Sequence, residues 1–237
     1  MRRLILICCA LFVATSAFAD LSKEESKRLS EAGAILNELR NSPDKGIPED
    51  LWNKSECIVV IPSIKKAAFA VGGEYGSGVM SCRTGTGHES ATQWSAPVFM
   101  QLMKGSVGFQ IGGESIDLVL LIMNRRGLDK LLEDKVSLGA DASVAAGPVG
   151  RTAEAATDAQ LHAEMLSYSR SEGVFAGIDL SGGVLRPDKG ALAHAYGPNV
   201  TARDVVMGTR KVAKLDAAVP FMTALKQDVR ATTGKKK

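Results

Sequence analysis

"PVFMQLMKGSVGFQIGGESIDLVLLIM" (residues 97–123) is a long apolar stretch that glycines interrupt at short intervals. "AAFAVGGEYGSGVMSCR" (67–83) has the same character, and "CIVVIP" (57–62) precedes it. Short apolar runs bounded by glycine are typical of strands. Glycine pairs at 72–73 and 112–113 predict bulges or tight bends, so we expect a curved sheet.

Helices are expected on both sides of these strands. Residues 22–40 form an amphipathic pattern that opens with a capping box, Ser22 and Glu25. Pro48 opens a second short helix through Trp52, and "NRRGLDKLLED" (124–134) predicts a third. Two more strands, "GVFAGIDL" and "GGVLRP", precede helices at 202–207 and 219–229. This order predicts an α+β fold with a curved, largely antiparallel or barrel-like sheet and helices at both ends.

The run "SLGADASVAAGPVGR" (137–151) consists almost entirely of small residues. Valines at 144 and 149 distinguish it from a flexible linker, which would lack them. Small side chains allow backbones to approach closely. We therefore expect packed chain in a crowded part of the fold.

The first nineteen residues have the features of a secretory signal peptide. Arg2 and Arg3 precede the apolar run 4–13, and Ala17-Phe18-Ala19 is a small-x-small cleavage site. The alternative is a short membrane anchor, for which the apolar run is short. We expect cleavage near Ala19, a single domain over 20–237, and an exported protein in the periplasm or associated with the cell envelope.

The expected export also affects the predicted oxidation state of the cysteines. Cys57 and Cys82 remain after cleavage, and an even pair in an exported protein indicates a disulfide; two buried free thiols are the alternative.

Charge is balanced overall. The 29 basic residues face 26 acidic ones, and two of the arginines belong to the signal segment. Basic residues concentrate toward the C-terminus, where the tail 231–237 ends in Lys235 to Lys237. A nearly neutral, exported chain without aromatic residues between its basic pairs is a poor candidate for nucleic-acid binding.

No catalytic pattern can be assembled from the sequence. "VGGEYGSGV" lacks the lysine and the following helix of a phosphate loop, and no G-x-S-x-G elbow occurs. His88, His162 and His194 are scattered. We expect no enzyme, no metal and no cofactor, with a hydrolase as the less favoured alternative.

Basic side chains are the candidate binding groups, because arginine forks and lysines suit phosphate oxygens. Their alternative role is that of solvated charges or surface ion pairs. The candidates are Lys65, Lys66, Arg125, Arg126, Lys130, Arg151 and Arg170.

Several motifs together resemble the SYLF domain family over roughly residues 28–210. They are "IPSIKKAAFAVGGEYGSGVM", "WSAPVFM", "GSVGFQIGGESIDLVLLIMN", "LGADASVAAGPVGR", "YSRSEGVFAGIDLSGGVL" and Tyr196-Gly197. This family comprises lipid-binding domains of bacterial exported proteins and of eukaryotic actin-patch and trafficking proteins.

The resemblance implies a non-catalytic module that binds acidic phospholipids, phosphoinositides in eukaryotes, through a basic surface and an N-terminal amphipathic helix. In this sequence the helix residues are Lys27, Arg28, Leu29, Leu36 and Leu39. The expected partner is an anionic phospholipid surface of the envelope. The alternative is an envelope scaffold that binds a protein partner, as some family members bind actin filaments.

Overall fold

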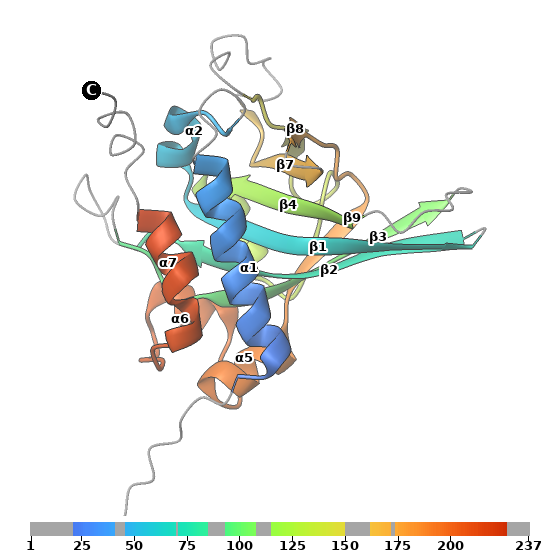
Figure 1. The fold of residues 1–237 in the computed structure, drawn as a ribbon. Coiled ribbons are helices and arrows are strands. Elements are labelled where there is room, and N and C mark those ends of the chain that lie inside the picture. The colour runs from blue at the N-terminus through green and yellow to red at the C-terminus, as the bar shows by residue number, and fades with distance from the viewer. Residues whose placement is uncertain are drawn as a thin grey trace, which may run out of the picture.

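A computed structural model describes residues 21–40, 46–69, 71–84, 93–107, 115–149, 162–171 and 174–226. These residues form one curved sheet with helices at both ends of the chain (Figure 1). The strands are β1 (Cys57–Phe69), β2 (Val71–Cys82), β3 (Val98–Val107), β4 (Ser115–Ile122), β5 (Val136–Ser137), β6 (Val144–Ala146), β7 (Met165–Ser171), β8 (Val174–Gly177) and β9 (Gly183–Pro187). The helices are α1 (Lys23–Arg40), α2 (Glu49–Lys54), α3 (Arg125–Leu131), α5 (Lys189–Tyr196), α6 (Ala202–Met207) and α7 (Val219–Lys226), with a 3-10 turn at Asp216–Ala218.

The sheet is a strongly curved half-barrel, which confirms the expected fold class. Its strands run in the order β5-β9-β3-β2-β1-β4-β7-β6, and β8 pairs with β7. The described strand pairs are antiparallel except β6 with β7. Large apolar residues of β1 to β4 are almost fully buried, so the core lies along these strands.

The bend in the sheet lies in β1. The register of β1 against β2 shifts between Val60 and Lys65, and Ser63 in that interval has φ of 53°. Opposite the bend, a Cβ on Gly78 would lie 2.1 Å from the carbonyl oxygen of Val60. The expected bulge at Gly72-Gly73 is wrong, because both residues pair in continuous register with β1 and β3. Gly78 therefore allows β2 to approach β1 closely, and the register irregularity lies in β1. The pair at 112–113 lies outside the described residues.

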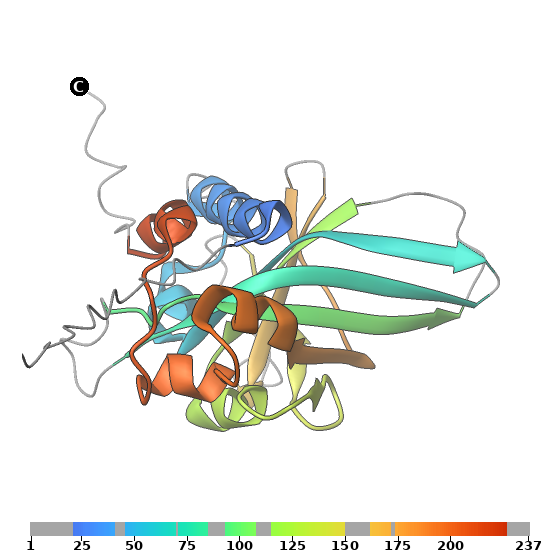
Figure 2. The same cartoon turned by 90° about the horizontal axis from the view of Figure 1, so that it is seen from below.

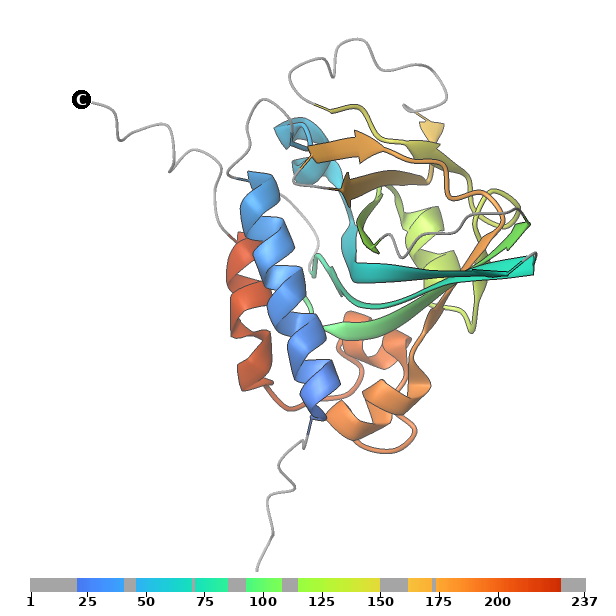
Figure 3. The same ribbon diagram turned by 45° about the vertical axis from the view of Figure 1, so that its right-hand side comes forward.

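Helix α1 lies beside α7 and covers part of β1 and β2 (Figures 1 and 3). Its capping box forms as expected: the Ser22 N–H donates to Glu25 Oε2 at 2.8 Å, and the Glu25 N–H donates to Ser22 Oγ at 3.1 Å. The leucines of its apolar face are buried against the core, Leu29, Leu36 and Leu39 among them. In this conformation they contact protein, so a membrane role for them requires α1 to leave the core.

The ends of β1, β2 and β3 project beyond the helices as a three-stranded ribbon (Figures 1 and 2). We call this ribbon the finger and define it as residues 65–69, 71–75 and 103–107.

The small-residue run is packed only in part, because Leu138, Ala142 and Gly147 are buried whereas residues 139–141 and Ser143 are exposed. It contains the end of β5 at Ser137, a turn and β6, and Gly147 lies against the ring of Tyr168. A Cβ on Gly147 would be 2.1 Å from Tyr168 Cζ, so a larger residue at this position would displace the ring. The end of the run, Gly150 and Arg151, lies outside the described residues.

Candidate functional site

Three of the predicted phosphate-binding residues lie together on α3. Asn124 caps this helix by accepting a hydrogen bond from the Gly127 N–H at 2.9 Å. Arg125 and Arg126 follow directly, and Lys130 comes one turn later. They border an open cleft of about 620 Å³, which we call the α3 cleft. Its lining is Asn124, Arg125, Arg126, Lys130, Gly139, Ala140, Asp141, Ser143, His162 and Glu164.

Glu164 anchors one wall of the α3 cleft. Its side chain is 8% exposed, and the Lys130 ammonium donates to its two oxygens at 3.0 and 2.9 Å. The Ser143 N–H donates to the same carboxylate at 2.9 Å. Burial alone raises the pKa of Glu164, but the bonds from Lys130 and Ser143 and the charge of Arg126 outweigh it and lower the pKa below its usual value. Glu164 is therefore ionised at neutral pH and holds Lys130 in place.

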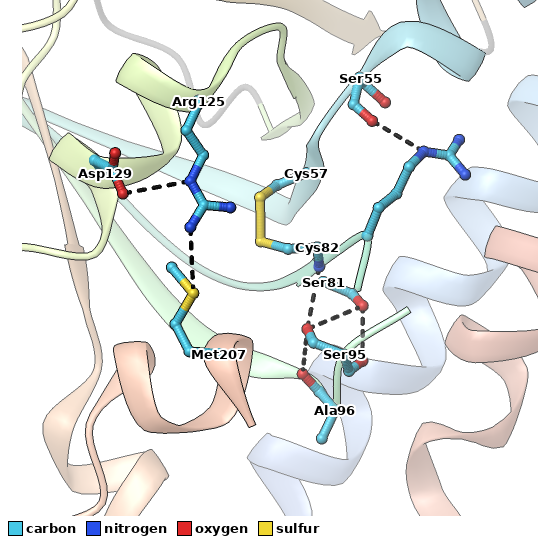
Figure 4. The surroundings of a disulfide bond; sticks show 10 residues. Ser55, Cys57, Ser81, Cys82, Ser95, Ala96, Arg125, Asp129 and Met207 are labelled. Atoms are coloured by element: carbon cyan, nitrogen blue, oxygen red, sulfur yellow. Dashed lines mark hydrogen bonds and ion pairs between the residues drawn. A yellow bond between two sulfur atoms is a disulfide. The ribbon is translucent and has the colours of Figure 1, made fainter. Parts of the chain in front are cut away.

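The two arginines remain largely open to solvent. The side chain of Arg126 is 81% exposed, with Nε 3.8 Å from Glu164, and that of Arg125 is 61% exposed. Arg125 lies 3.7 Å from Asp129 and donates to Met207 Sδ of α6 at 3.4 Å (Figure 4). The exposed Arg125–Asp129 pair contributes a few tenths of a kcal/mol, and the Arg126–Glu164 contact is long at 3.8 Å, so both guanidinium groups are available to an incoming anion.

The other acidic residue that lines the cleft is Asp141, in the turn between β5 and β6. Asp141 accepts a hydrogen bond from the Ser137 N–H at 2.7 Å, and that bond lowers the pKa of Asp141. Its carboxylate thus fixes the turn that forms the far wall of the cleft.

Arg170 lies away from the α3 cleft. Residue 170 pairs with Asp117 near the start of β4, whereas α3 follows the end of that strand. Its guanidinium donates to Asp117 at 2.8 Å and also pairs with Glu38 of α1. The structure therefore separates Arg170 from Arg125 and Arg126, because Asp117 lies five residues, about 17 Å of strand, before the end of β4 at Ile122.

The other lysines of the predicted set also lie apart from the cleft. Lys65 is exposed and pairs with Ser115 and Tyr75 at the base of the finger. Residue 66 follows it in β1, and its side chain lies outside the described part, as does Arg151.

Two basic residues of α1, Lys27 and Arg28, are engaged in ion pairs. Lys27 lies 3.5 Å from Glu31 on the exposed face. Arg28 lies 2.9 Å from Asp188, which caps α5, and both side chains are mostly buried. His194 of α5 in turn lies 3.0 Å from Glu25. These contacts join α1 to α5, and no local sequence signal predicts them.

Cys57 and Cys82 lie opposite each other where β1 and β2 pair, and their sulfur atoms are at disulfide distance (Figure 4). Both residues are fully buried. The pairing agrees with the sequence-based expectation, and oxidation of the isolated protein stays a prediction.

Within the described ranges, no group of three His, Cys, Asp or Glu residues is arranged to hold a metal ion. No helix in that part of the chain is long and apolar enough to cross a membrane.

Comparison with known proteins supplies the family. The family model described as "Ysc84: Las17-binding protein actin regulator" matches residues 103–228, more than half of the chain. The chain belongs to the Ysc84 (SYLF) family. The resemblance drawn from the sequence motifs is thereby confirmed at the level of the family.

Eukaryotic proteins of this family are similar over most of the chain. An SH3 domain-containing protein of Schizosaccharomyces pombe is 34% identical over 186 residues, 77% of this chain and 41% of the relative. SH3 domain-containing YSC84-like protein 1 of Rattus norvegicus is 33% identical over 79% of this chain and 53% of its own length. LAS seventeen-binding protein 3 of Saccharomyces cerevisiae is 33% identical over 70% of this chain and 35% of its own length. The chain thus spans about half or less of these relatives.

Proposed function

We propose that this protein is a non-catalytic binding module that holds the head groups of anionic phospholipids in the α3 cleft. The observation that carries the proposal is the exposure of Arg125 and Arg126, 61% and 81%, side by side at the rim of that cleft. A guanidinium fork donates two parallel hydrogen bonds to phosphate oxygens. Two adjacent forks therefore suit a phosphate monoester or diester at a membrane surface.

The basic residues of the cleft differ in how strongly the protein itself binds them. Lys130 is bound by Glu164, so it supports the wall. Arg125 has an exposed partner, Asp129, and Arg126 lies 3.8 Å from the buried Glu164, whose two oxygens already accept from Lys130. A phosphate that replaces Asp129 as the partner of Arg125 displaces an ion pair of small stabilising effect. Family membership supports a binding role, because the family description and the name of one yeast relative both refer to binding.

We further propose that the mature protein is exported to the periplasm or the envelope, which would supply an anionic phospholipid surface. The sequence of residues 1–19 supports this proposal, and those residues lie outside the described part of the chain. Fractionation of cells expressing the full chain, with mass spectrometry of the mature N-terminus, tests it. An N-terminus at Asp20 in the periplasmic or membrane fraction is expected, whereas an intact Met1 in the cytosol contradicts the proposal.

The test of lipid binding is co-sedimentation with vesicles. We expect the protein to pellet with phosphatidylglycerol-containing vesicles at low salt, to pellet poorly with pure phosphatidylcholine, and to be partly released by added salt. Equal binding to both vesicle types, or binding to neither, contradicts the proposal.

A protein partner is the second candidate. One yeast relative is named for binding LAS seventeen, and the family description names actin regulation. Co-sedimentation with purified actin filaments in the absence of lipid tests this candidate. Saturable pelleting with filaments and none with vesicles would favour it over the lipid function.

A further inference from the structure

The finger presents an apolar pair to solvent. Tyr75 of β2 lies directly opposite Met103 of β3, and these residues are 44% and 39% exposed. Among the described residues, Val219 of α7 is the other exposed large hydrophobic residue. The Tyr75 hydroxyl accepts a hydrogen bond from Ser77 at 3.0 Å, so its polar end is satisfied while its ring stays uncovered.

On the same face of the ribbon, the next register row toward the tip has only small residue types. It consists of Ala67, Gly73 and Gly105 in β1, β2 and β3. A Cβ on Gly105 would meet no atom within 4 Å, and one on Gly73 would meet only the Lys104 carbonyl oxygen, at 3.8 Å. The following row of this face aligns positions 69, 71 and 107, which are phenylalanine and two valines. Along this face the finger therefore runs from a Tyr–Met row to a row of apolar residue types, and the row between them carries no charged residue type.

One lysine shares this face, and the other two lysines of the finger belong to the register row 66–74–104 of the opposite face, which also holds Glu74. Lys65 is exposed and pairs with Tyr75 in the same register row. Residues 65–75 and 103–107 together contain three lysines and one glutamate. An element that joins an apolar end to an excess of lysine complements an anionic lipid surface, where lysine reaches the head groups and tyrosine favours the interface.

We propose that the finger inserts into the interfacial layer of an anionic bilayer. The inference rests on the proposed membrane function, although it uses a different surface from the α3 cleft. Four residues separate the Tyr75 row from the Phe69 row, which is about 13 Å of strand. Interfacial elements bury their apolar side about 5 to 10 Å into the boundary between head groups and acyl chains. Insertion of the end row to that depth leaves Tyr75, Met103 and Lys65 among the head groups.

Charge argues against a second copy of the chain on this face. Stacking two fingers by their Tyr75 and Met103 faces would bring two Lys65 side chains into the same apolar contact, where like charges repel. A lipid surface supplies the opposite charge at that level. We therefore assign the face to the bilayer.

Tryptophan fluorescence tests the depth of the finger. Residue 75 is exposed, so Tyr75→Trp places a reporter on the finger without disturbing the core. Trp52 and Trp94 are buried and provide the background in the unsubstituted protein. On vesicles containing phosphatidylglycerol, we expect the emission of the introduced tryptophan to shift to shorter wavelength. Quenching by nitroxide on the head group should exceed quenching by nitroxide deep in the acyl chain.

Binding variants separate insertion from head-group attraction. Tyr75→Ser combined with Met103→Ser should lower vesicle affinity about tenfold because exposed apolar surface is removed. That loss should persist in about 1 M salt, where the Debye length is about 3 Å and charge attraction is screened. Val219→Ser is the matched control, an exposed apolar residue on α7 whose loss should leave affinity unchanged.

Each other outcome overturns the inference in a different way. Vesicle binding by the Tyr75→Trp variant with no change in its emission rejects insertion and leaves the proposed function standing. Absence of binding to any vesicle rejects both. A lipid-free dimer that the double serine variant dissociates, measured by sedimentation velocity, assigns the face to a second copy instead.

Discussion

Arg170 joins three parts of the fold through a single side chain. Arg170 lies in β7. It donates a hydrogen bond to Asp117 of β4 at 2.8 Å, and it pairs with Glu38 of α1. Asp117 also accepts a hydrogen bond from the Ser63 N–H at 2.9 Å, in the bend of β1. The side chain is 24% exposed, so these contacts are partly shielded from solvent. A head-group role for Arg170 would require this network to break.

We expect Arg170→Gln to lower the free energy of unfolding by about 1.5 to 3 kcal/mol, because two carboxylates lose a charged hydrogen-bond donor. Urea denaturation followed by circular dichroism measures the change. Arg186→Gln, at an exposed position where the partner is Gln101, is the control and should change stability by less than about 0.5 kcal/mol. Unchanged stability together with weaker vesicle binding would show instead that Arg170 binds lipid.

The α3 cleft shows which residues of the site the sequence could reveal. Arg125, Arg126 and Lys130 were predictable as a group, since they lie within two turns of one helix. Glu164 and Ser143 were not, because each becomes part of the site through contacts 21 or 34 positions away along the chain. The partners of Arg170 were missed for the same reason, since Asp117 lies 53 positions away and Glu38 lies 132.

Helix α1 is held at both ends by polar contacts between elements. Arg28 and Asp188 join it to α5 across 160 positions of sequence, and Glu38 joins it to β7. Burial alone raises the pKa of Asp188, but hydrogen bonds from Arg28, the Ala191 N–H and Gln101 outweigh it and lower the pKa. The ionised carboxylate therefore stabilises the α1–α5 contact at neutral pH.

Asp188→Asn should destabilise the protein at pH 7 and make its stability less sensitive to acid. An unfolded aspartate has a pKa of about 3.9, so the stabilisation is complete above that value and is lost as the pH falls through the lower pKa of the folded protein. Urea denaturation between pH 7 and acid pH measures the two curves. Asp50→Asn, at an exposed position of α2, is the matched control substitution and should lower stability at pH 7 by less than Asp188→Asn does. Parallel curves for Asp188→Asn and the unsubstituted protein would contradict the role of Asp188.

The strand pair β1–β2 is where we expect a covalent link. Cys57 and Cys82 are 25 positions apart, and closing a loop of that length stabilises a protein by about 3 kcal/mol in the chain-entropy model. Alkylation and mass spectrometry of protein purified from an oxidising compartment should find no free thiol at either cysteine. Two alkylated cysteines would contradict the prediction.

Elements were predictable where the sequence carries a local signal. The capping box of α1 and the glycine-bounded runs of β2 and β3 are such signals, and both produced the expected elements. Helix α5 was missed although Asp188 caps it, accepting from the Ala191 N–H at 3.1 Å. It is eight residues long and has Gly190 in its first turn, so its helical pattern is weak. The bend at Ser63 depends on Asp117 from another strand, and no local pattern marks it.

At the scale of the whole molecule, the half-barrel separates the two surfaces that we propose to bind a membrane. The α3 cleft gathers exposed arginines at one end of β4, and the finger projects beyond its other end. Without residues 1–19 the chain has 27 basic and 26 acidic residues, so long-range attraction to an anionic surface is weak and binding depends on local groups. The basic tail 231–237, outside the described residues, is the competing local group.

The most direct measurement of the central claim is the affinity for phosphatidylglycerol-containing vesicles of three proteins: unsubstituted, Arg125→Gln/Arg126→Gln, and Lys214→Gln/Lys226→Gln. The last removes the same charge from exposed positions that do not line the α3 cleft. Each basic residue at an anionic surface contributes about 1 kcal/mol, so the cleft variant should bind about 30-fold more weakly while remaining folded by circular dichroism. The control should bind nearly as the unsubstituted protein does. Equal losses in the two variants, or no loss in the cleft variant, would show that the α3 cleft is not the head-group site.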